Sequence, residues 1–407
     1  MPESESSQLN LICLATYFKG TDFIRECKSQ GCYVVLVTKE KMLNEPWPRD
    51  SLDDVIALPN DAGSDLFIHL AAHLARDRKL DRIVALEEFD VLTAAVIREH
   101  LLMPGMTSST ARRFRDKLLM AVKAREAGVK VPEFVALINH DEIRSFMERV
   151  PWPWIIKPRS DVSAIGVRKV YEPAAVWRVI EELDGRERLR ERSPHHLLAQ
   201  FVHGEVFHVD SLVSEGKVIF AGANQYGRPP MDVAHGGGAY ISSTVPHDGD
   251  DEKQLFAANR KLVKALGLQN GATHAEFIKS SADGLFYFLE IAARVGGAYI
   301  AEVLEAASGV NLWREWAKIE ISDKPAKKIR PTRKNYAGII LSLAKQEYPD
   351  TSAYADAEIV YRVKKRHHAG LIVSSPEFGR VRKLLDQYAR RFADDFVAIE
   401  PPLERAE

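Results

Sequence analysis

The 407-residue sequence has few cysteines, no long apolar run and no excess of charge of one sign. Its 56 basic and 57 acidic residues give a formal net charge of -1, so nothing favours a nucleic acid or an anionic membrane as a partner. No apolar stretch approaches the roughly 20 residues of a membrane-spanning helix. The first ten residues lack the basic start of a signal peptide, and the odd set Cys13, Cys27 and Cys32 is typical of buried thiols in a reducing cytosol. We therefore expect a cytoplasmic protein.

Residues 9–102 alternate between short apolar runs and helical patterns. The expected strands are residues 11–16, 33–38, 55–58 and 82–86, and the expected helices are residues 21–30, 64–77 and 91–100. This order predicts a parallel sheet covered by helices on both faces, with a ligand beyond the carboxyl ends of the strands. Glu87 and Glu88 follow the last of these strands, where surface charge is the expected role and substrate contact the alternative. Because no G-x-G-x-x-G follows the first strand, we predict no dinucleotide site.

Residues 272–294 predict a β-hairpin with a turn at residues 282–284. A three-residue loop pairs Glu276 with Glu290, and it pairs Ile278 with Phe288. Since side chains alternate along a strand, one surface is expected to collect His274, Glu276, Ile278, Phe288, Glu290 and Arg294. Two facing carboxylates repel each other unless a cation lies between them, so the pair predicts a Mg²⁺ site beside bound phosphates. A solvated sheet face is the alternative.

Four further stretches bear on function. Residues 107–128 predict one helix, in which Lys117 taken alone is a solvent-exposed lysine. Lys157 ends a strand before a loop of small residues, a pattern that lets backbone N–H groups hold phosphates although it does not match the P-loop motif. Residues 222–243 predict a long connection with a proline pair and three glycines, a candidate lid. Residues 336–395 predict a small α+β lobe.

Six loose motifs, taken in order, resemble those of the ATP-grasp superfamily. They are Asp116-Lys117, Gly128-x-x-x-Pro132, Ile156-Lys157-Pro158, Phe201-Val202-x-Gly204-Glu205, His274-Ala275-Glu276 and Leu289-Glu290-x-x-x-Arg294-x-Gly296-Gly297. The chain is most similar to the carboxylate–amine ligase branch that includes bacterial L-amino-acid ligases (dipeptide synthases), and the resemblance covers nearly its whole length. It implies an α/β and α+β architecture, with a Rossmann-like parallel domain (residues 1–106), a lid subdomain (107–196), an antiparallel ATP-grasp domain (197–325) and a closing α+β lobe (326–407).

The resemblance also implies roles for particular residues. Lys117 and Lys157 would contact ATP phosphates, and Glu276 and Glu290 would bind one or two Mg²⁺ or Mn²⁺ ions. Arg294 would steady the γ-phosphate and the acyl phosphate made from it. The other implied nucleotide contacts are Ser163 and Gly166 in a phosphate loop, Gln200, Phe201 and Val202 at the adenine, Glu205 at the ribose, and Leu289 beneath the base.

The implied activity is ATP-dependent joining of a carboxylate to an amine through an acyl phosphate. The substrates would be amino acids, or an amino acid and a small carboxylic acid, and a homodimer through the first domain would be common for such folds. His274 and His235 are candidate acceptors of the amine proton. Ala292 stands where many members have asparagine, so the resemblance does not decide whether a second metal ion binds. The alternatives are a biotin-carboxylase-like enzyme that activates bicarbonate and a regulatory ATP-binding protein without catalysis.

Overall fold

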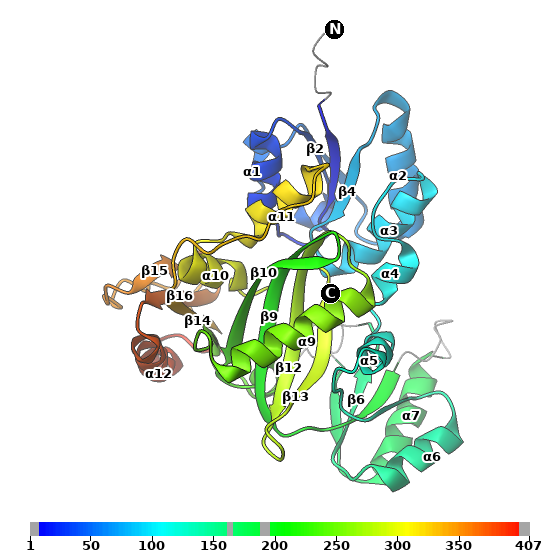
Figure 1. Ribbon diagram of the computed structural model, residues 1–407, viewed down its shortest axis with the longest axis vertical. Helices are drawn as coiled ribbons and strands as arrows, with labels where there is room; N and C mark the ends of the chain where they lie inside the picture. Colours follow the sequence, from blue (N-terminus) through cyan, green and yellow to red (C-terminus); the bar gives the residue numbers. More distant parts are fainter. Residues whose placement is uncertain (1–7, 161–165, 188–195, 399–407) are drawn as a thin grey trace.

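The computed structural model describes residues 8–160, 166–187 and 196–398. Its N-terminal part is the predicted parallel sheet, and its four strands lie in the order β3-β2-β1-β4 (Figure 1). The elements of this part are β1 (Asn10–Leu14), α1 (Thr21–Ser29), β2 (Tyr33–Lys39), η1 (Glu40–Met42), η2 (Arg49–Ser51), β3 (Asp54–Leu58), α2 (Ser64–Asp77), β4 (Arg82–Ala85), η3 (Glu88–Asp90) and α3 (Val91–His100). Leu11 and Cys13 pack with α1, whereas Ile12 and Leu14 pack with α2 and α3. Both faces of the sheet are therefore buried, and all three cysteines are buried and free, as predicted.

A second, antiparallel sheet forms the lid subdomain, with strand order β5-β8-β6-β7. Its elements are β5 (Phe134–Ala136), α6 (His140–Arg149), β6 (Trp154–Pro158), β7 (Arg168–Val170), α7 (Pro173–Glu187) and β8 (His196–Gln200). Trp154, Ile156 and Leu198 from the sheet pack against Phe146 and Val176 from the two helices. Lys157 follows the buried Ile156 near the end of β6.

The single helix predicted for residues 107–128 is wrong, because the structure has two helices, α4 (Ser108–Arg112) and α5 (Lys117–Glu126). Asp116 has an extended backbone between them, and its carboxylate accepts hydrogen bonds from the backbone N–H groups of Leu118 and Leu119. An aspartate that bonds nearby backbone N–H groups starts a helix more readily than it continues one. Lys117 is thereby the first residue of α5.

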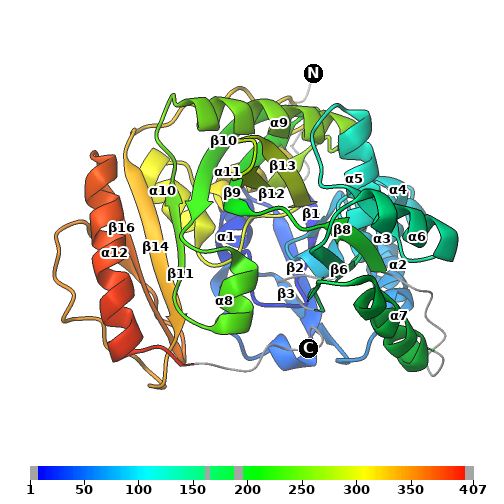
Figure 2. The same cartoon turned by 90° about the horizontal axis from the view of Figure 1, so that it is seen from below.

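The central sheet has eight strands in the order β13-β12-β9-β10-β11-β14-β16-β15. They are β9 (Gly204–Ser214), β10 (Lys217–Tyr226), β11 (Tyr240–Thr244), β12 (Gly271–Ser280), β13 (Phe286–Ala292), β14 (Tyr336–Leu343), β15 (Ile359–Arg362) and β16 (His368–Ser375). The helices are α8 (Pro230–Gly236), α9 (Asp250–Leu266), α10 (Ile300–Ser308), α11 (Leu312–Ile321) and α12 (Phe378–Asp395). Seen from below, the lid subdomain lies at one end of this sheet and α12 at the other (Figure 2).

The two faces of the central sheet have different covers. Ala275 and Phe277 of β12 lie in an apolar cluster with Leu255 and Leu262 of α9. By alternation, His274 and Glu276 point to the other face, toward the N-terminal sheet and the lid subdomain. Farther along, α12 packs against β14 and β16, so the final helix extends the same layered arrangement.

The long structureless connection predicted for residues 222–243 is wrong, whereas the role of this segment as a lid stays a prediction. β10 continues to Tyr226, α8 starts at Pro230, and β11 pairs with both β10 and β14. The proline pair begins a helix because proline fits the first helical turn, where no N–H partner is needed. The side chain of His235 lies outside the described residues. Among the described residues, none of the helices is both long and apolar enough to span a bilayer.

Candidate active site

The predicted pairing of Glu276 with Glu290 is confirmed, but the turn beyond it differs from the prediction. The loop holds four residues, since the N–H of Ser280 donates to the carbonyl of Leu285 at 2.9 Å. A β-bulge at Leu289 then adds one residue to β13 and restores the register at Glu290. The two deviations of one residue cancel, so the carboxylates face each other across the ladder.

The predicted pairing of Ile278 with Phe288 is wrong. Ile278 pairs with Tyr287, and Phe288 packs against Phe277 in the cluster beneath α9. The bulge turns Phe288 to the far face and leaves Leu289 beside Ile278. The surface around the two glutamates is therefore lined by a partly buried leucine and tyrosine in place of a phenylalanine.

Two lysines come to this carboxylate pair from different parts of the chain. Lys117 is only 8% exposed, so the solvent-exposed role expected for it in isolation is wrong. Its Nζ lies 3.1 Å from Oε2 of Glu290. Lys157 lies on β6, where burial lowers the pKa of its amine to about 8, although Glu290 acts in the opposite direction. The start of α5 and the end of β6 thus direct two ammonium groups at the hairpin.

A buried polar cluster continues the site along β9 and β12. Asp210 accepts from Nδ1 of His208 at 2.6 Å and from Nδ1 of His274 at 2.9 Å. Nε2 of His274 lies 3.5 Å from Glu276, whose Oε1 also accepts from Tyr226 at 2.6 Å. Sequence reasoning did not assign His208, Asp210 or Tyr226 to the site. The sequence contained a signal for them, because His208 and Asp210 are two residues apart on β9 and therefore share one face. Asp210 also pairs with His274 across the ladder.

The charges in this cluster fix its protonation. Burial lowers the pKa of His274, but Asp210 and Glu276 outweigh it, and the pKa rises to about 9. The pKa of Asp210 is held well below its usual range, because the two histidines outweigh the effect of burial. At neutral pH, His274 is therefore a cation that donates to two carboxylates.

Gly296 leaves room for this arrangement. A Cβ placed on Gly296 would lie 2.7 Å from Oδ1 of Asp210 and 3.1 Å from Nδ1 of His274. The adjacent Gly297 has no atom within 4 Å of the same position. The backbone after Arg294 thus crosses the Asp210–His274 pair at a distance that only glycine allows.

Arg294 connects the hairpin to the N-terminal sheet. Its Nη2 lies 2.8 Å from Oε2 of Glu88, and the other oxygen of Glu88 pairs with Arg115. Burial raises the pKa of Glu88, but Arg294 and Arg115 outweigh it and hold the pKa at about 2. Glu87 is likewise buried and pairs with Lys19 at 2.6 Å, so the surface role expected for both glutamates is wrong. The Nε–H of Arg294 is buried and has no acceptor within the described residues.

The residues expected at the adenine lie between β8 and β9. The backbone N–H of Gln200 donates to the backbone carbonyl of Glu133 at 2.7 Å. The backbone N–H of Phe201 donates to the backbone carbonyl of Pro153 at 3.1 Å. Val202 and Leu289 pack on the same small apolar cluster around Ile278. Their common packing places the segment between β8 and β9 next to the bulge in the hairpin.

The remaining predicted contacts fall at the edges of this region. Glu205 is exposed and accepts from Nε2 of Gln225 at 2.9 Å. Gly166 has a φ of +70°, and a Cβ there would lie 2.9 Å from Cγ of Pro158. Ser163 lies outside the described residues. The structure thus brings together Lys117, Lys157, His274, Glu276, Glu290 and Arg294, with the adenine-side residues adjacent.

Comparisons with known proteins agree with this architecture. A family model described as an ATP-grasp domain matches residues 150–302. The L-arginine-specific L-amino acid ligase of Bacillus subtilis is 23% identical over 252 residues, which make up 62% of this chain and 60% of that ligase. The match therefore spans less than two thirds of that relative.

Two solved structures share the fold over nearly the whole chain. The L-amino acid ligase from Bacillus licheniformis has a TM-score of 0.74 at 18% identity, covering 96% of this chain and 98% of that one. A biotin carboxylase from Campylobacter jejuni has a TM-score of 0.72 at 15% identity, and the match covers 97% of this chain and 93% of that one. Residues 150–302 thus match the ATP-grasp domain model, and the chain shares its fold with these two enzymes over nearly its whole length.

Proposed function

We propose that this protein is an ATP-dependent ligase that joins a carboxylate to an amine, with amino acids, or an amino acid and a small carboxylic acid, as substrates. The observation that carries the proposal is the Glu276–Glu290 pair with Nζ of Lys117 3.1 Å from Glu290. Like charges opposite each other on a ladder are unfavourable by themselves. Because the pair lies in a half-buried site, we infer that cations bind between the two carboxylates and offset their repulsion.

The donor set fits magnesium. Mg²⁺ binds oxygen ligands, usually one or two carboxylates together with substrate phosphates and water. Glu276 and Glu290 supply two carboxylates on one face, and the described residues offer no further carboxylate beside them on the hairpin. The other ligands would then come from ATP and water, and bound magnesium would neutralise the charge on the phosphate oxygens.

The other residues of the site suit phosphoryl transfer. Lys117 and Lys157 would hold the phosphates, and the unpaired Nε–H of Arg294 would donate to the transferred phosphoryl group or to the acyl phosphate. The substrate carboxylate would attack the γ-phosphorus, ADP would leave, and the amine would then displace phosphate from the acyl group. The chain contributes position and charge in the first step.

His274 suits the role of a fixed cation better than that of a base. Both of its ring nitrogens face carboxylates, Asp210 at 2.9 Å and Glu276 at 3.5 Å. With a pKa of about 9 it already carries the proton at neutral pH. Its predicted role as proton acceptor stays a prediction, and these contacts argue against it. We assign it the task of orienting Glu276.

The test is ADP and phosphate release from Mg·ATP across a matrix of amino-acid pairs, with mass spectrometry of the products. The ligase proposal expects release that depends on two amino acids, or on an amino acid and a small carboxylic acid, with an amide product of matching mass. Release that depends on bicarbonate and biotin would instead identify a biotin-carboxylase-like enzyme. Nucleotide binding without release under any of these conditions would indicate a regulatory protein.

Glu290→Gln is the decisive variant for the site. It keeps the side-chain size but removes one charge from the pair, so we expect turnover to fall by at least about a hundredfold. Glu142→Gln, an exposed change on α6, is the matched control and should retain full turnover. Unchanged ADP release in Glu290→Gln would contradict the proposed site.

A further inference from the structure

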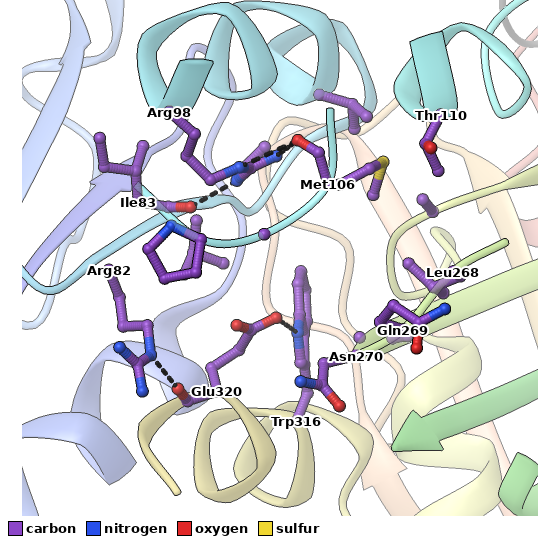
Figure 3. Close-up of a pocket in the computed structure, with 18 of the residues that line it drawn as sticks. Arg82, Ile83, Arg98, Met106, Thr110, Leu268, Gln269, Asn270, Trp316 and Glu320 are labelled. Carbon is purple, nitrogen blue, oxygen red and sulfur yellow. Dashed lines mark hydrogen bonds between the residues drawn. The ribbon is translucent and has the colours of Figure 1, made fainter. Parts of the chain in front are cut away.

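A cavity of about 430 Å³ lies between the N-terminal sheet and the central sheet (Figure 3). β4, the segment after α3, residues 267–272 and α11 form its walls. Its lining contains none of the side chains assigned to the candidate active site. The volume lies within the range of small-molecule sites in proteins.

One wall of the cavity carries Arg98 of α3, which is 9% exposed. Its guanidinium donates to backbone carbonyls only, that of Ile83 at 2.6 Å and that of Met106 at 3.0 and 3.2 Å. These three bonds leave two of the five N–H groups of the side chain. Gly105 allows this packing, because a Cβ there would lie 2.8 Å from Cδ of Arg98.

The opposite wall carries the carboxylate of Glu320 on α11. Nε1 of Trp316 donates to one of its oxygens at 2.9 Å. Arg82 makes no ion pair with this carboxylate, because it donates to the backbone carbonyl of Glu320 and pairs with Asp323. In Figure 3 the second carboxylate oxygen points away from Trp316 into the space below Arg98. Burial raises the pKa of this carboxyl.

Arg98 and Glu320 lie on opposite walls of the cavity and do not form an ion pair with each other. Within the described ranges, neither Arg98 nor Glu320 has an oppositely charged side chain within 4.0 Å. Leaving a buried charge unpaired costs free energy, so such groups are usually paired with a ligand or with each other. Here a cation and an anion lie on opposite sides of a cavity, with the apolar side chains of Leu268 and Met106 also on its walls.

We propose that this cavity binds a small zwitterion whose carboxylate meets Arg98 and whose ammonium group meets Glu320. Free amino acids and dipeptides share this chemistry. The cavity is separate from the proposed ATP site, but two segments of its walls lead directly to residues of the ATP site. β4 leads to Glu88, and Ala293 of the lining precedes Arg294.

The first test uses the unaltered full chain without ATP, so it measures binding without turnover, and the second test separates this cavity from the proposed active site. Isothermal titration calorimetry at neutral pH compares L-leucine and L-alanyl-L-leucine with N-acetyl-L-leucine and L-leucinamide, which each lack one charge. We expect at least one of the two zwitterions to bind, and its affinity identifies the free amino acid or the dipeptide as the ligand. The two half-charged compounds should bind at least about tenfold more weakly. No binding of either zwitterion, or equal binding of a half-charged compound, would overturn the proposal.

The second test locates the site. Glu320→Gln keeps an acceptor for Trp316 but removes the charge, and should weaken binding at least about tenfold. Glu315→Gln, on the same helix and paired with Lys318, should bind like the unaltered chain. Retention of full affinity in Glu320→Gln would assign the ligand to another site and overturn the proposal. If Glu320→Gln does not fold, a crystal structure of the unaltered chain with the bound zwitterion decides, because the proposal requires it between Arg98 and Glu320.

Discussion

At the scale of single residues, Lys157 links the pH of the solution to phosphate binding. Burial lowers its pKa to about 8 in the absence of a ligand. The protonated amine attracts a triphosphate, so above this pKa the lysine must take up a proton when ATP binds. We expect the Kd for Mg·ATP to be nearly constant below pH 8 and to rise by up to about tenfold per pH unit above it. Calorimetric titrations between pH 6.5 and 9.5 measure this dependence.

Lys157→Arg is the control for this titration. Arginine stays charged over the whole range, so the bend near pH 8 should disappear in the variant. His274, with a pKa of about 9, titrates in the same region and would leave its own bend in both proteins. An identical bend at pH 8 in the variant would show that Lys157 is not the titrating group.

Gly296 gives a second prediction at this scale. In Gly296→Ala the added methyl group would meet Asp210 at 2.7 Å, so the backbone after Arg294 must move. We expect the free energy of unfolding to fall by about 1–3 kcal/mol and ligase turnover to fall with it. Gly297→Ala adds the same methyl group to open space and serves as the matched control in urea denaturation. Equal stability of the two variants would contradict the close approach.

Local patterns predicted part of this site. Glu276 and Glu290 were found because alternation on two neighbouring strands is a short-range property. The contact of Arg294 with Glu88 joins residues 206 positions apart. No short-range pattern reports such a contact, and Glu88 was therefore expected at the surface.

At the scale of elements, the break between α4 and α5 decides where Lys117 points. Asp116 caps α5 and also pairs with Arg159, next to Lys157 and Pro158 on the lid subdomain. Asp116→Asn keeps the cap but loses the ion pair, whereas Asp116→Ala loses both. We expect Asp116→Ala to lower the free energy of unfolding by about 1–2 kcal/mol and Asp116→Asn by less. Both should weaken Mg·ATP binding, because Lys117 and Lys157 lose their relative position.

The cap of α6 offers the control for these variants. Asn139 accepts hydrogen bonds from the backbone N–H groups of Asp141 and Glu142. Unlike that of Asp116, its side chain is neutral and forms no ion pair. Asn139→Ala should cost about 1 kcal/mol and leave the Kd for Mg·ATP unchanged. A nucleotide affinity equal to that of the unaltered chain in Asp116→Ala would show that the cap does not position Lys117.

Element boundaries were predicted well where the periodicity was regular and poorly where single residues decided. The four parallel strands and three helices of the N-terminal part match their predicted residues closely. The bulge at Leu289, the cap at Asp116 and the helix that begins at Pro230 depend on local hydrogen bonds that hydrophobic patterning does not encode. The resemblance indicated the order of the subdomains but not these details.

At the scale of the whole molecule, Glu88 joins the N-terminal sheet to both other parts. It pairs with Arg294 after the central hairpin and with Arg115 before α5, and Arg115 also donates to the carbonyl of Ser160 in the lid subdomain. Glu88→Gln would remove the carboxylate with which both buried arginines form their ion pairs. We expect a loss of about 3–5 kcal/mol in the free energy of unfolding, measured by urea denaturation. Glu126→Gln, which breaks an exposed pair with Lys123, should change it by no more than about 0.5 kcal/mol.

The same ion pairs predict how stability depends on pH. The pKa of Glu88 falls from 4.5 to about 2 on folding, so its contribution is fully present above pH 4.5 and is lost as the pH falls toward 2. The difference in unfolding free energy between the unaltered chain and Glu88→Gln should therefore be constant from pH 7 to about pH 5 and shrink below that. Paired urea titrations at pH 7, 5, 4 and 3 measure this difference. A difference that stays constant down to pH 3 would mean that the cost of the variant comes from packing alone and that the Glu88 charge does not hold the three parts together.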